Sequence, residues 1–300
     1  MAVIEHTNIQ TNKITLHVAT AGDPANPMLL FLHGFPEFWY AWRHQLEALS
    51  DRFFCVAPDT RGINRSEKPV DVDDYVIEEL VADTVGLIGA FDKETAIVIG
   101  HDWGGFIAWE TAIRHPEVVE KLVIVNCAHP AVMSEELRRD GSEQQTRSQY
   151  MLAFRAEGSE ALLAANDFEA FRSNILEPLV AAGHMTASDA MAYVDAWSVE
   201  GALTGGLNYY RANKSGPPSG DDAEPRSVAE NRVTVPTMVI WGEADPYFAP
   251  ECVTRMDKAV EDLRLERMPG HDHWIVHQAT DRITDLIREF AGDDGQRNRR

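Results

Sequence analysis

The 300-residue sequence is poor in positive charge and in cysteine, and it contains no long apolar run. Lys and Arg number 27 against 48 Asp and Glu, which gives a formal net charge of −21. Because phosphate groups repel such a surface, we expect no binding to nucleic acid or to an anionic membrane. No run approaches the roughly 20 apolar residues that a membrane-spanning helix needs. The 44% of hydrophobic residues still suffices for a sizeable core.

The three cysteines, Cys55, Cys127 and Cys252, are odd in number and widely spaced. Cys55 and Cys127 lie in apolar, strand-like runs, so we expect buried free thiols in a reducing compartment. Residues 1–10 have neither a basic segment nor an apolar one, and no secretory signal is expected. These features predict a cytoplasmic location. The sequence is compatible with a homodimer and does not decide the oligomeric state.

Short apolar runs alternate with helical patterns over most of the chain. A hairpin is expected at residues 8–22, with its turn at Thr11 and Asn12. The expected strands are 28–32, 53–57, 96–99, 122–125, 237–241 and 263–268, and the expected helices are 39–49, 77–91, 104–115, 250–260 and 280–290. This alternation predicts an α/β fold with a mostly parallel sheet flanked by helices on both faces.

The alternation stops between residues 129 and 233. Helical patterns there cover 143–155, 159–172, 187–200 and 206–212, and a polar loop rich in Gly, Pro, Ser and Asp follows at 213–226. We interpret residues 129–233 as an all-helical cap. The cap is inserted between a first core part, residues 1–128, and a second core part, residues 234–300.

An acid occupies the tip of a sharp turn in the middle of the chain. Residues 96–105 run Ala-Ile-Val-Ile-Gly-His-Asp-Trp-Gly-Gly, which combines an apolar strand, a strained turn and the start of a helix. This is the context of a nucleophile elbow, with Asp102 at the position where serine is usual. A carboxylate nucleophile attacks saturated carbon and leaves an ester. The competing interpretation is an ordinary strand-to-helix turn with an exposed Asp.

Two partners for Asp102 follow it in the order expected of this fold, acid and then histidine. Asp245 follows the strand at 237–241, and His273 follows the strand that ends at 268. Both therefore lie at carboxyl ends of strands, where open α/β sheets place their chemistry. We predict Asp245 as the orienting acid and His273 as the general base.

Nearby residues compete for these two roles. His271 is an alternative base, and Asn126 occupies a position at which an orienting acid is also conceivable. An amide cannot stabilise an imidazolium by charge, so Asp245 is preferred. The run His271-Asp272-His273 also suggests a metal site, but no further ligands occur at a recognisable spacing, and we predict no metal.

The first parallel strand ends in Leu-Phe-Leu-His-Gly-Phe-Pro, residues 30–36. Backbone N–H groups of Phe35 and Trp103 are predicted to form an oxyanion hole. Phe35, Pro36 and Trp103 are also predicted to contact the substrate. A simple strand-ending turn is the alternative for His33 and Gly34.

The motifs resemble those of the α/β-hydrolase fold family and, within it, of the epoxide hydrolases. The motifs shared with this family and with the haloalkane dehalogenases are His33-Gly34-Phe35-Pro36, Asp59-Thr60-Arg61-Gly62, residues 100–105, Trp241-Gly242-Glu243-Ala244-Asp245 and His273-Trp274. One position departs from the family's Arg-Gly-x-Gly-x-Ser pattern, because Asn64 stands at the second Gly. If that position has a positive φ, Asn is the least costly replacement.

The cap segments are more discriminating. Residues 207–211, Leu-Asn-Tyr-Tyr-Arg, are similar to the family's Asn-aromatic-Tyr-Arg motif, and residues 148–154 are similar to the segment that carries its other tyrosine. The resemblance implies that Tyr150 and Tyr210 donate to the epoxide oxygen, because a phenol with a pKa of about 10 stays protonated at neutral pH. Tyr209 and Tyr193 are expected to pack only.

The resemblance implies an epoxide hydrolase that forms a vicinal diol from a small-molecule epoxide and water through an alkyl ester on Asp102, with no metal or organic cofactor. Haloalkane dehalogenase is the alternative, because an indole N–H of Trp103 can hold a halide. That family usually has a second donor, for which the cap offers only Trp197. Fluoroacetate dehalogenase and a non-catalytic binding relative are further alternatives.

Overall fold

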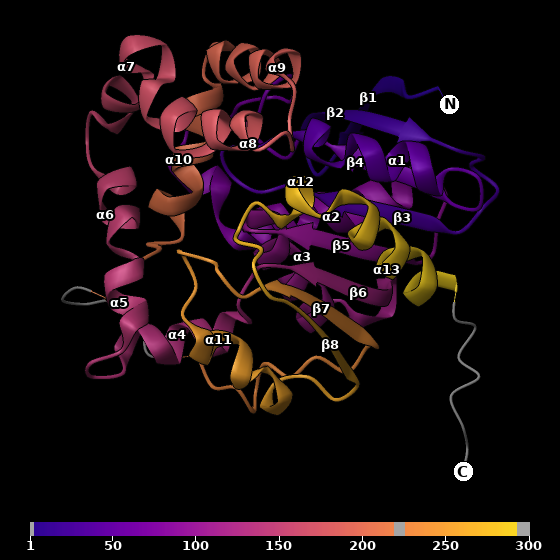
Figure 1. The fold of residues 1–300 in the computed structure, drawn as a ribbon. Coiled ribbons are helices and arrows are strands. Elements are labelled where there is room, and N and C mark those ends of the chain that lie inside the picture. Colours follow the sequence, from indigo (N-terminus) through magenta and orange to yellow (C-terminus); the bar gives the residue numbers. More distant parts are fainter. Residues whose placement is uncertain (1–2, 219–225, 293–300) are drawn as a thin grey trace.

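Within residues 3–218 and 226–292, which the computed structural model describes, the chain forms one eight-stranded sheet with helices on both faces (Figure 1). The strand order is β1-β2-β4-β3-β5-β6-β7-β8, and only the β1–β2 and β2–β4 pairs are antiparallel. The bounds are Glu5–Thr11 (β1), Ile14–Ala21 (β2), Met28–Leu32 (β3), Phe54–Pro58 (β4), Ala96–His101 (β5), Val119–Val125 (β6), Thr237–Gly242 (β7) and Leu263–Met268 (β8). The predicted α/β fold with a mostly parallel sheet is confirmed.

Alternate side chains of the central strands enter two separate hydrophobic clusters, one on each face of the sheet. In β3, Leu30 joins the cluster shared with α2 and α3, and its neighbour Phe31 joins the cluster shared with α1 and α13. The core helices are α1 (Arg43–Leu49), α2 (Ile77–Ala90), α3 (Trp103–Arg114), α11 (Pro250–Thr254), α12 (Ile275–Gln278) and α13 (Thr280–Gly292). Full burial of each such side chain contributes about 1.5–3 kcal/mol, which is why these strands are apolar on both faces.

Between β6 and β7 the described part of the chain forms helices. These inserted helices are α4 (Pro130–Arg138), α5 (Glu143–Arg147), α6 (Gln149–Arg155), α7 (Ser159–Phe171), a π-helical turn at Arg172–Leu176, α8 (Glu177–Ala181), α9 (Ala187–Ser198) and α10 (Ala202–Ala212). Hydrogen bonds fasten them to the core: Tyr209 Oη donates to the carbonyl of Arg61 at 2.7 Å, and Trp197 Nε1 donates to that of Pro36 at 2.5 Å. Figure 1 shows α6 to α10 beside the sheet rather than within its layers.

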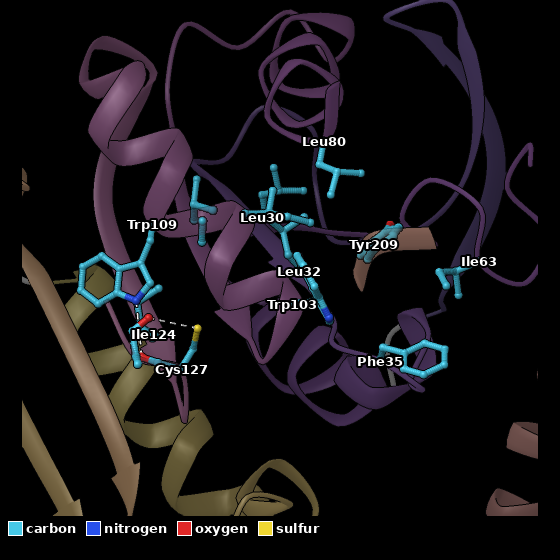
Figure 2. Close-up of a cluster of buried hydrophobic side chains, with 14 of the residues drawn as sticks. Leu30, Leu32, Phe35, Ile63, Leu80, Trp103, Trp109, Ile124, Cys127 and Tyr209 are labelled. Atoms are coloured by element: carbon cyan, nitrogen blue, oxygen red, sulfur yellow. Dashed lines mark hydrogen bonds between the residues drawn. The ribbon is translucent and has the colours of Figure 1, made fainter. Parts of the chain in front are cut away.

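The cluster on the α2 and α3 face continues from the sheet to the inserted helices (Figure 2). Leu30 and Leu32 lie at its sheet end. Trp103, at the start of α3, packs edge-on against the ring of Tyr209 with their centroids 5.4 Å apart. The hydrophobic core therefore reaches the edge of the sheet at which β5 ends.

Several predicted bounds were wrong in detail. The hairpin starts at Glu5, and its turn is at Asn12 and Lys13, whose φ values are 42° and 62°. A two-residue hairpin turn of this kind needs two positive φ values, which β-branched Thr11 resists and Asn12 tolerates. The predicted loop at 213–226 includes residues 219–225, which lie outside the described residues.

Four of the predicted helices are divided. Helix 39–49 opens with a 3₁₀ turn at Trp39–Trp42, helix 250–260 splits after α11, and helix 143–155 breaks at Ser148. In α7 the backbone becomes left-handed at residues 166–168, which lets Phe168 pack on Trp197 with their centroids 5.6 Å apart. Helices α4, α8 and α12 were not predicted. Tertiary packing decides these breaks, and the periodicity of the sequence does not report them.

Two other expectations are confirmed by the structure. Cys55, Cys127 and Cys252 are free and buried, and Asn64 has a φ of 44°, which meets the condition under which Asn is the least costly replacement for Gly. No helix in the described part of the chain is long and apolar enough to cross a membrane.

Candidate active site

Asp102 lies between β5 and α3 in a strained backbone conformation, with φ of 51° and ψ of −120°. Such a conformation costs about 1–3 kcal/mol, so the surrounding chain must enforce it. Gly100 and Gly104 make the turn sterically feasible. A Cβ on Gly100 would lie 2.2 Å from the carbonyl oxygen of Gly104, and one on Gly104 would lie 2.1 Å from that of Leu32. The backbone therefore explains the glycines on both sides of Asp102.

The two carboxylate oxygens of Asp102 have different surroundings. Oδ1 accepts a hydrogen bond from the backbone N–H of Phe35 at 2.9 Å, whereas Oδ2 lies 3.5 Å from Nε2 of His273. Trp103 is the first residue of α3, so its N–H belongs to the first turn, which has no intrahelical acceptors. Oδ1 is thus held by the loop after β3, and Oδ2 is directed toward the histidine.

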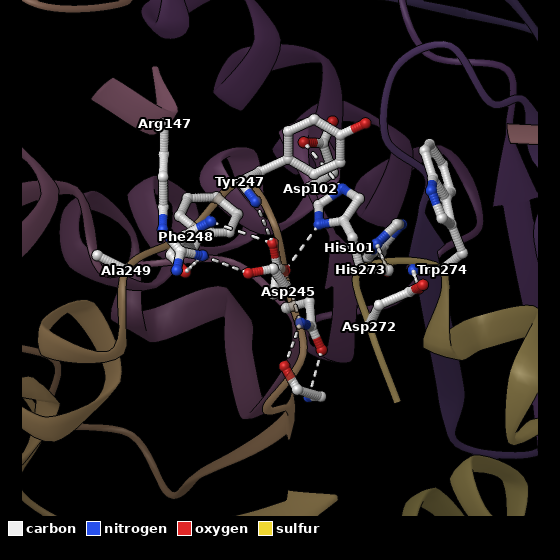
Figure 3. Close-up of polar contacts among 12 residues, drawn as sticks. His101, Asp102, Arg147, Asp245, Tyr247, Phe248, Ala249, Asp272, His273 and Trp274 are labelled. Atoms are coloured by element: carbon white, nitrogen blue, oxygen red, sulfur yellow. Dashed lines mark hydrogen bonds and ion pairs between the residues drawn. The ribbon is translucent and has the colours of Figure 1, made fainter. Parts of the chain in front are cut away.

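His273 lies between two carboxylates (Figure 3). Its Nδ1–H donates to Oδ2 of Asp245 at 2.9 Å. Asp245 is fixed in turn by three donors: the N–H groups of Tyr247 and Phe248 bind Oδ1 at 2.7 and 3.0 Å, and the Asn126 amide binds Oδ2 at 2.7 Å. Burial acts to raise the pKa of Asp245, but the charge of His273 and these hydrogen bonds outweigh burial and lower that pKa.

The pKa of His273 differs strongly from that of a free imidazole. Burial acts to lower the pKa, but the negative charges of Asp245 and Asp102 outweigh burial and raise the pKa of His273 to about 10. The ring is therefore protonated at neutral pH for as long as Asp102 carries its charge. The charge of Asp102 is one of the causes of this shift, so removing that charge is expected to lower the pKa of His273.

The competing residues lie elsewhere or support this set. His271 contacts the carbonyl of Pro269, with 3.2 Å between Nδ1 and the oxygen, and within the described residues it forms no hydrogen bond or ion pair with Asp102 or Asp245. Asn126 is a hydrogen-bond donor to Asp245 and does not replace it. Among the described residues no group of three or more His, Cys, Asp and Glu is placed to hold a metal ion.

Two tyrosines from the inserted helices face Asp102. Tyr150 on α6 and Tyr210 on α10 have ring centroids 6.4 Å apart. Burial raises the pKa of both phenols well above the ordinary value, and the charge of Asp102 acts in the same direction. Both side chains are therefore protonated hydrogen-bond donors throughout the neutral range.

Asp102 lies where two cavities meet. A larger arm of about 480 Å³ is lined by Trp103, Phe106 and Met133 among others, and a smaller arm of about 210 Å³ is lined by Phe35, Pro36 and His273 among others. Asp102, Tyr150 and Tyr210 line both arms. The side chains predicted for the site thus line these two arms, except for Asp245, which lines neither arm and is joined to the site by its hydrogen bond with His273.

Residues 27–280 match the family model of the α/β hydrolase fold. The chain belongs to the α/β-hydrolase fold family. The AB hydrolase superfamily protein YfhM of Bacillus subtilis is 39% identical to this α/β hydrolase over 287 residues, which are 94% of this chain and 96% of that protein. Epoxide hydrolase 4 of Mus musculus is 32% identical over 298 residues, covering 98% of this chain and 80% of that protein.

A solved structure is also similar to this α/β hydrolase along nearly its whole length. It is the crystal structure of an epoxide hydrolase from Bacillus megaterium in complex with an inhibitor. The TM-score is 0.87 at 31% sequence identity, and the alignment covers 95% of this chain and 99% of that one. These relatives place the chain in the epoxide hydrolase branch of the family.

The site of this α/β hydrolase also contains polar residues that were not predicted. Glu37 is buried, with one carboxylate oxygen 2.8 Å from Nδ1 of His101 and the other 2.7 Å from Nε2 of His277. His101 Nε2 lies 2.9 Å from the carbonyl oxygen of His273. Burial acts to raise the pKa of Glu37, but His101 and His277 outweigh burial and hold it well below the usual range. This network ties the backbone of His273 to the loop that follows Pro36.

Tyr193 belongs to the same network. Its phenol oxygen lies 3.3 Å from Nε2 of His277. The expectation that Tyr193 only packs is therefore wrong. Tyr209 is buried against the core and, like Tyr193, does more than pack, because its hydroxyl donates to the carbonyl of Arg61. In the sequence, the indication of this network was Glu37, the acid that follows the run His-Gly-Phe-Pro. It was not sufficient for a prediction, because a single Glu in an apolar stretch does not show which histidines it will contact.

Proposed function

We propose that this protein hydrolyses epoxides to vicinal diols through a covalent ester on Asp102. One observation carries the proposal: a buried carboxylate, a histidine paired with a second carboxylate, and two protonated phenols all face the same cavity. The roles proposed are nucleophile for Asp102, orienting acid for Asp245, general base for His273, and epoxide-oxygen donors for Tyr150 and Tyr210. The relatives named as epoxide hydrolases support this substrate class.

In the first step Oδ2 of Asp102 attacks one oxirane carbon, and the bond from that carbon to the oxirane oxygen breaks. Oδ2 suits this role because Oδ1 is occupied by the N–H of Phe35. The phenols of Tyr150 and Tyr210 donate to the oxygen as negative charge develops on it. The product is a hydroxyalkyl ester of Asp102.

In the second step a water molecule attacks the ester carbonyl carbon, and His273 takes a proton from it. Oδ1 becomes the oxyanion of the tetrahedral intermediate, and the N–H groups of Phe35 and Trp103 are the donors proposed to stabilise it. Collapse of the intermediate releases the diol and restores the carboxylate. Phe35, Pro36 and Trp103 are proposed to contact the substrate, as lining residues of the two arms.

The protons balance over the two steps. His273 begins as an imidazolium. When the ester forms, the opened epoxide oxygen takes up one proton from the phenols, and the proton that His273 gives up replaces it, so that both phenols end the step protonated. Esterification removes the negative charge of Asp102, which is one of the causes that raise the pKa of His273. His273 can then lose its proton and serve as the base, and it regains a proton from water during ester hydrolysis.

The division of the chain into core and cap is part of the proposal. Residues 129–233 form the proposed cap, which supplies Tyr150 and Tyr210, and residues 1–128 and 234–300 form the core, which supplies Asp102, Asp245 and His273. The substrate is therefore proposed to bind between the cap and the core.

Halide binding is disfavoured by one contact. A halide leaving group needs a second N–H donor besides Trp103, and the cap offers Trp197 as the only distinct candidate. The indole N–H of Trp197 donates to the carbonyl of Pro36 at 2.5 Å and is not directed at Asp102. This contact favours an epoxide over a haloalkane substrate.

A single turnover in ¹⁸O-labelled water tests the covalent mechanism, with racemic styrene oxide as the substrate. We expect the first diol to contain unlabelled oxygen from Asp102 and the enzyme to acquire the label at that residue. Mass spectrometry of the diol and of the peptide that contains Asp102 measures both. Label in the first diol would rule out Asp102 as the nucleophile, and bromide release from a bromoalkane, assayed in parallel, would favour the dehalogenase.

Replacing Tyr210 by Phe is expected to slow ester formation by about 10²-fold, because one donor to the developing oxyanion is lost. Hydrolysis of the ester is expected to stay nearly unchanged, since the phenol does not face the attacking water in the proposed step. Stopped-flow measurement separates the two rates. An equal loss in both steps would show that Tyr210 has a structural role.

A further inference from the structure

A third phenol lies at the active site and has no part in the proposed chemistry. Tyr247 follows Asp245 by two residues at the carboxyl end of β7. Its ring packs edge-on against the ring of His273, with centroids 4.8 Å apart, and against that of Tyr150, with centroids 5.3 Å apart. It lines the smaller arm together with Asp102, and Figure 3 draws its ring beside Asp102 and above His273.

The position of Tyr247 is set by the same contacts that hold the catalytic acid. Its own N–H donates to Oδ1 of Asp245 at 2.7 Å. Arg147 donates to the carbonyl of Asp245 on one side and to that of Phe248 on the other, at 2.5 and 3.0 Å. The backbone on either side of Tyr247 is therefore held in place, and so is the direction in which its ring enters the cavity.

The hydroxyl of Tyr247 is a donor without an acceptor. Over residues 3–218 and 226–292, no hydrogen bond from this hydroxyl is present. Burial and the charges of Asp245 and Asp102 raise the pKa of the phenol to about 12, so the group keeps its proton at neutral pH. A phenol that keeps its proton and lines a cavity is available to a ligand.

The walls of the smaller arm offer the Tyr247 hydroxyl few acceptors. Away from the catalytic residues its walls are largely apolar, and they include Phe35, Phe154, Leu163, Phe171, Ile175 and Trp274. The other uncharged polar side chain, Asn174, already directs its amide to the carbonyl of Ala170 at 2.7 Å. A substrate with an oxygen in this arm would give the Tyr247 hydroxyl an acceptor there.

We propose that Tyr247 determines specificity by donating a hydrogen bond to an oxygen on the substituent that occupies the smaller arm. The substrate class is then an epoxide with an aromatic or aliphatic substituent joined through an ether or carbonyl oxygen, as in a glycidyl ether. This inference rests on the proposed epoxide hydrolysis. A site built around a hydrogen bond discriminates against the analogue that lacks the acceptor.

The experiment compares phenyl glycidyl ether with 2-(2-phenylethyl)oxirane, in which a methylene replaces the ether oxygen. The ratio of their kcat/KM values is measured for the wild type and for Tyr247→Phe, which keeps the ring and removes only the hydroxyl. We expect the ratio to fall about three- to tenfold in Tyr247→Phe, with the value for the methylene analogue little changed. Tyr40→Phe is the matched control, since the Tyr40 hydroxyl donates to Asp189 at 2.8 Å and lines neither arm.

A second variant locates the substituent. Ala170 lines the smaller arm, so Ala170→Leu narrows it and is expected to raise KM for both probes. No change in KM, an unchanged ratio in Tyr247→Phe, or an equal loss on both probes in that variant would each overturn the role given to Tyr247. If the wild type hydrolyses neither probe and also fails to hydrolyse styrene oxide, the proposed function itself fails. The thermal unfolding midpoint of each variant shows whether that variant is folded.

Discussion

Asp102→Asn is expected to lower diol formation by on the order of 10⁴-fold or more, because no other group at the site can form the ester. The amide retains an oxygen for the N–H of Phe35, and Asn tolerates the positive φ of this position, so the fold should be kept. Steady-state turnover of styrene oxide by the purified variant measures the effect. Retention of more than about a hundredth of the wild-type rate would contradict the covalent mechanism.

The same variant tests the electrostatic account of His273. Removing the negative charge of Asp102 removes one of the causes that raise the pKa of His273 to about 10, so that pKa is expected to fall. The sign follows from the charge, since a less negative site favours the neutral imidazole. A titration of the His273 ring by NMR measures the shift, and an unchanged midpoint would show that Asp102 does not control the base.

His273→Gln is expected to trap the enzyme as the ester. Oδ2 of Asp102 can still attack the oxirane, but no base remains to activate water, so turnover is expected to fall by about 10²–10⁴-fold. One equivalent of epoxide should be consumed, and the mass of the protein should rise by the mass of the substrate. Intact-protein mass spectrometry after rapid quenching measures the adduct.

Asp102→Asn serves as the control for this trap, because a protein without the nucleophile should gain no mass. His271→Gln is a second control, since its ring contacts the carbonyl of Pro269 rather than either carboxylate. The ester mechanism would be excluded by a His273→Gln protein that stays unmodified and yet loses turnover. Accumulation in His271→Gln instead would transfer the role of base to that residue.

The parts of the fold that the sequence predicted well are those in which burial acts on a whole segment. The run at 28–32 coincides with β3, because a buried strand must be apolar over its entire length. The bounds of β8 also match the predicted 263–268, although this edge strand contains Arg264, Glu266 and Arg267 and is only partly buried. The breaks within predicted helices were missed. At Ser148 and at residues 166–168 the chain leaves the helical conformation to fit neighbouring helices, and no residue type at those places demands the break.

The site could be predicted where chemistry restricts the residue and the spacing together. Asp102 needed glycines on both sides, and Asp245 and His273 had to follow strands in a set order. Glu37 and Tyr247 were not found, because each is an ordinary residue whose role depends on what packs against it. The contacts that define them, to His101, His277 and His273, join segments far apart in the chain.

The sequence by itself determined the α/β architecture, the family and the candidate reacting groups, since strained turns and apolar strands restrict which residues can occupy them. Tertiary structure alone decided that Oδ1 and Oδ2 of Asp102 face different partners, that two arms meet at that carboxylate, and that His273 is held protonated between two negative charges. The physical reason is that local steric limits act on neighbours in the chain, whereas electrostatics and cavity shape depend on distances between residues brought together by folding.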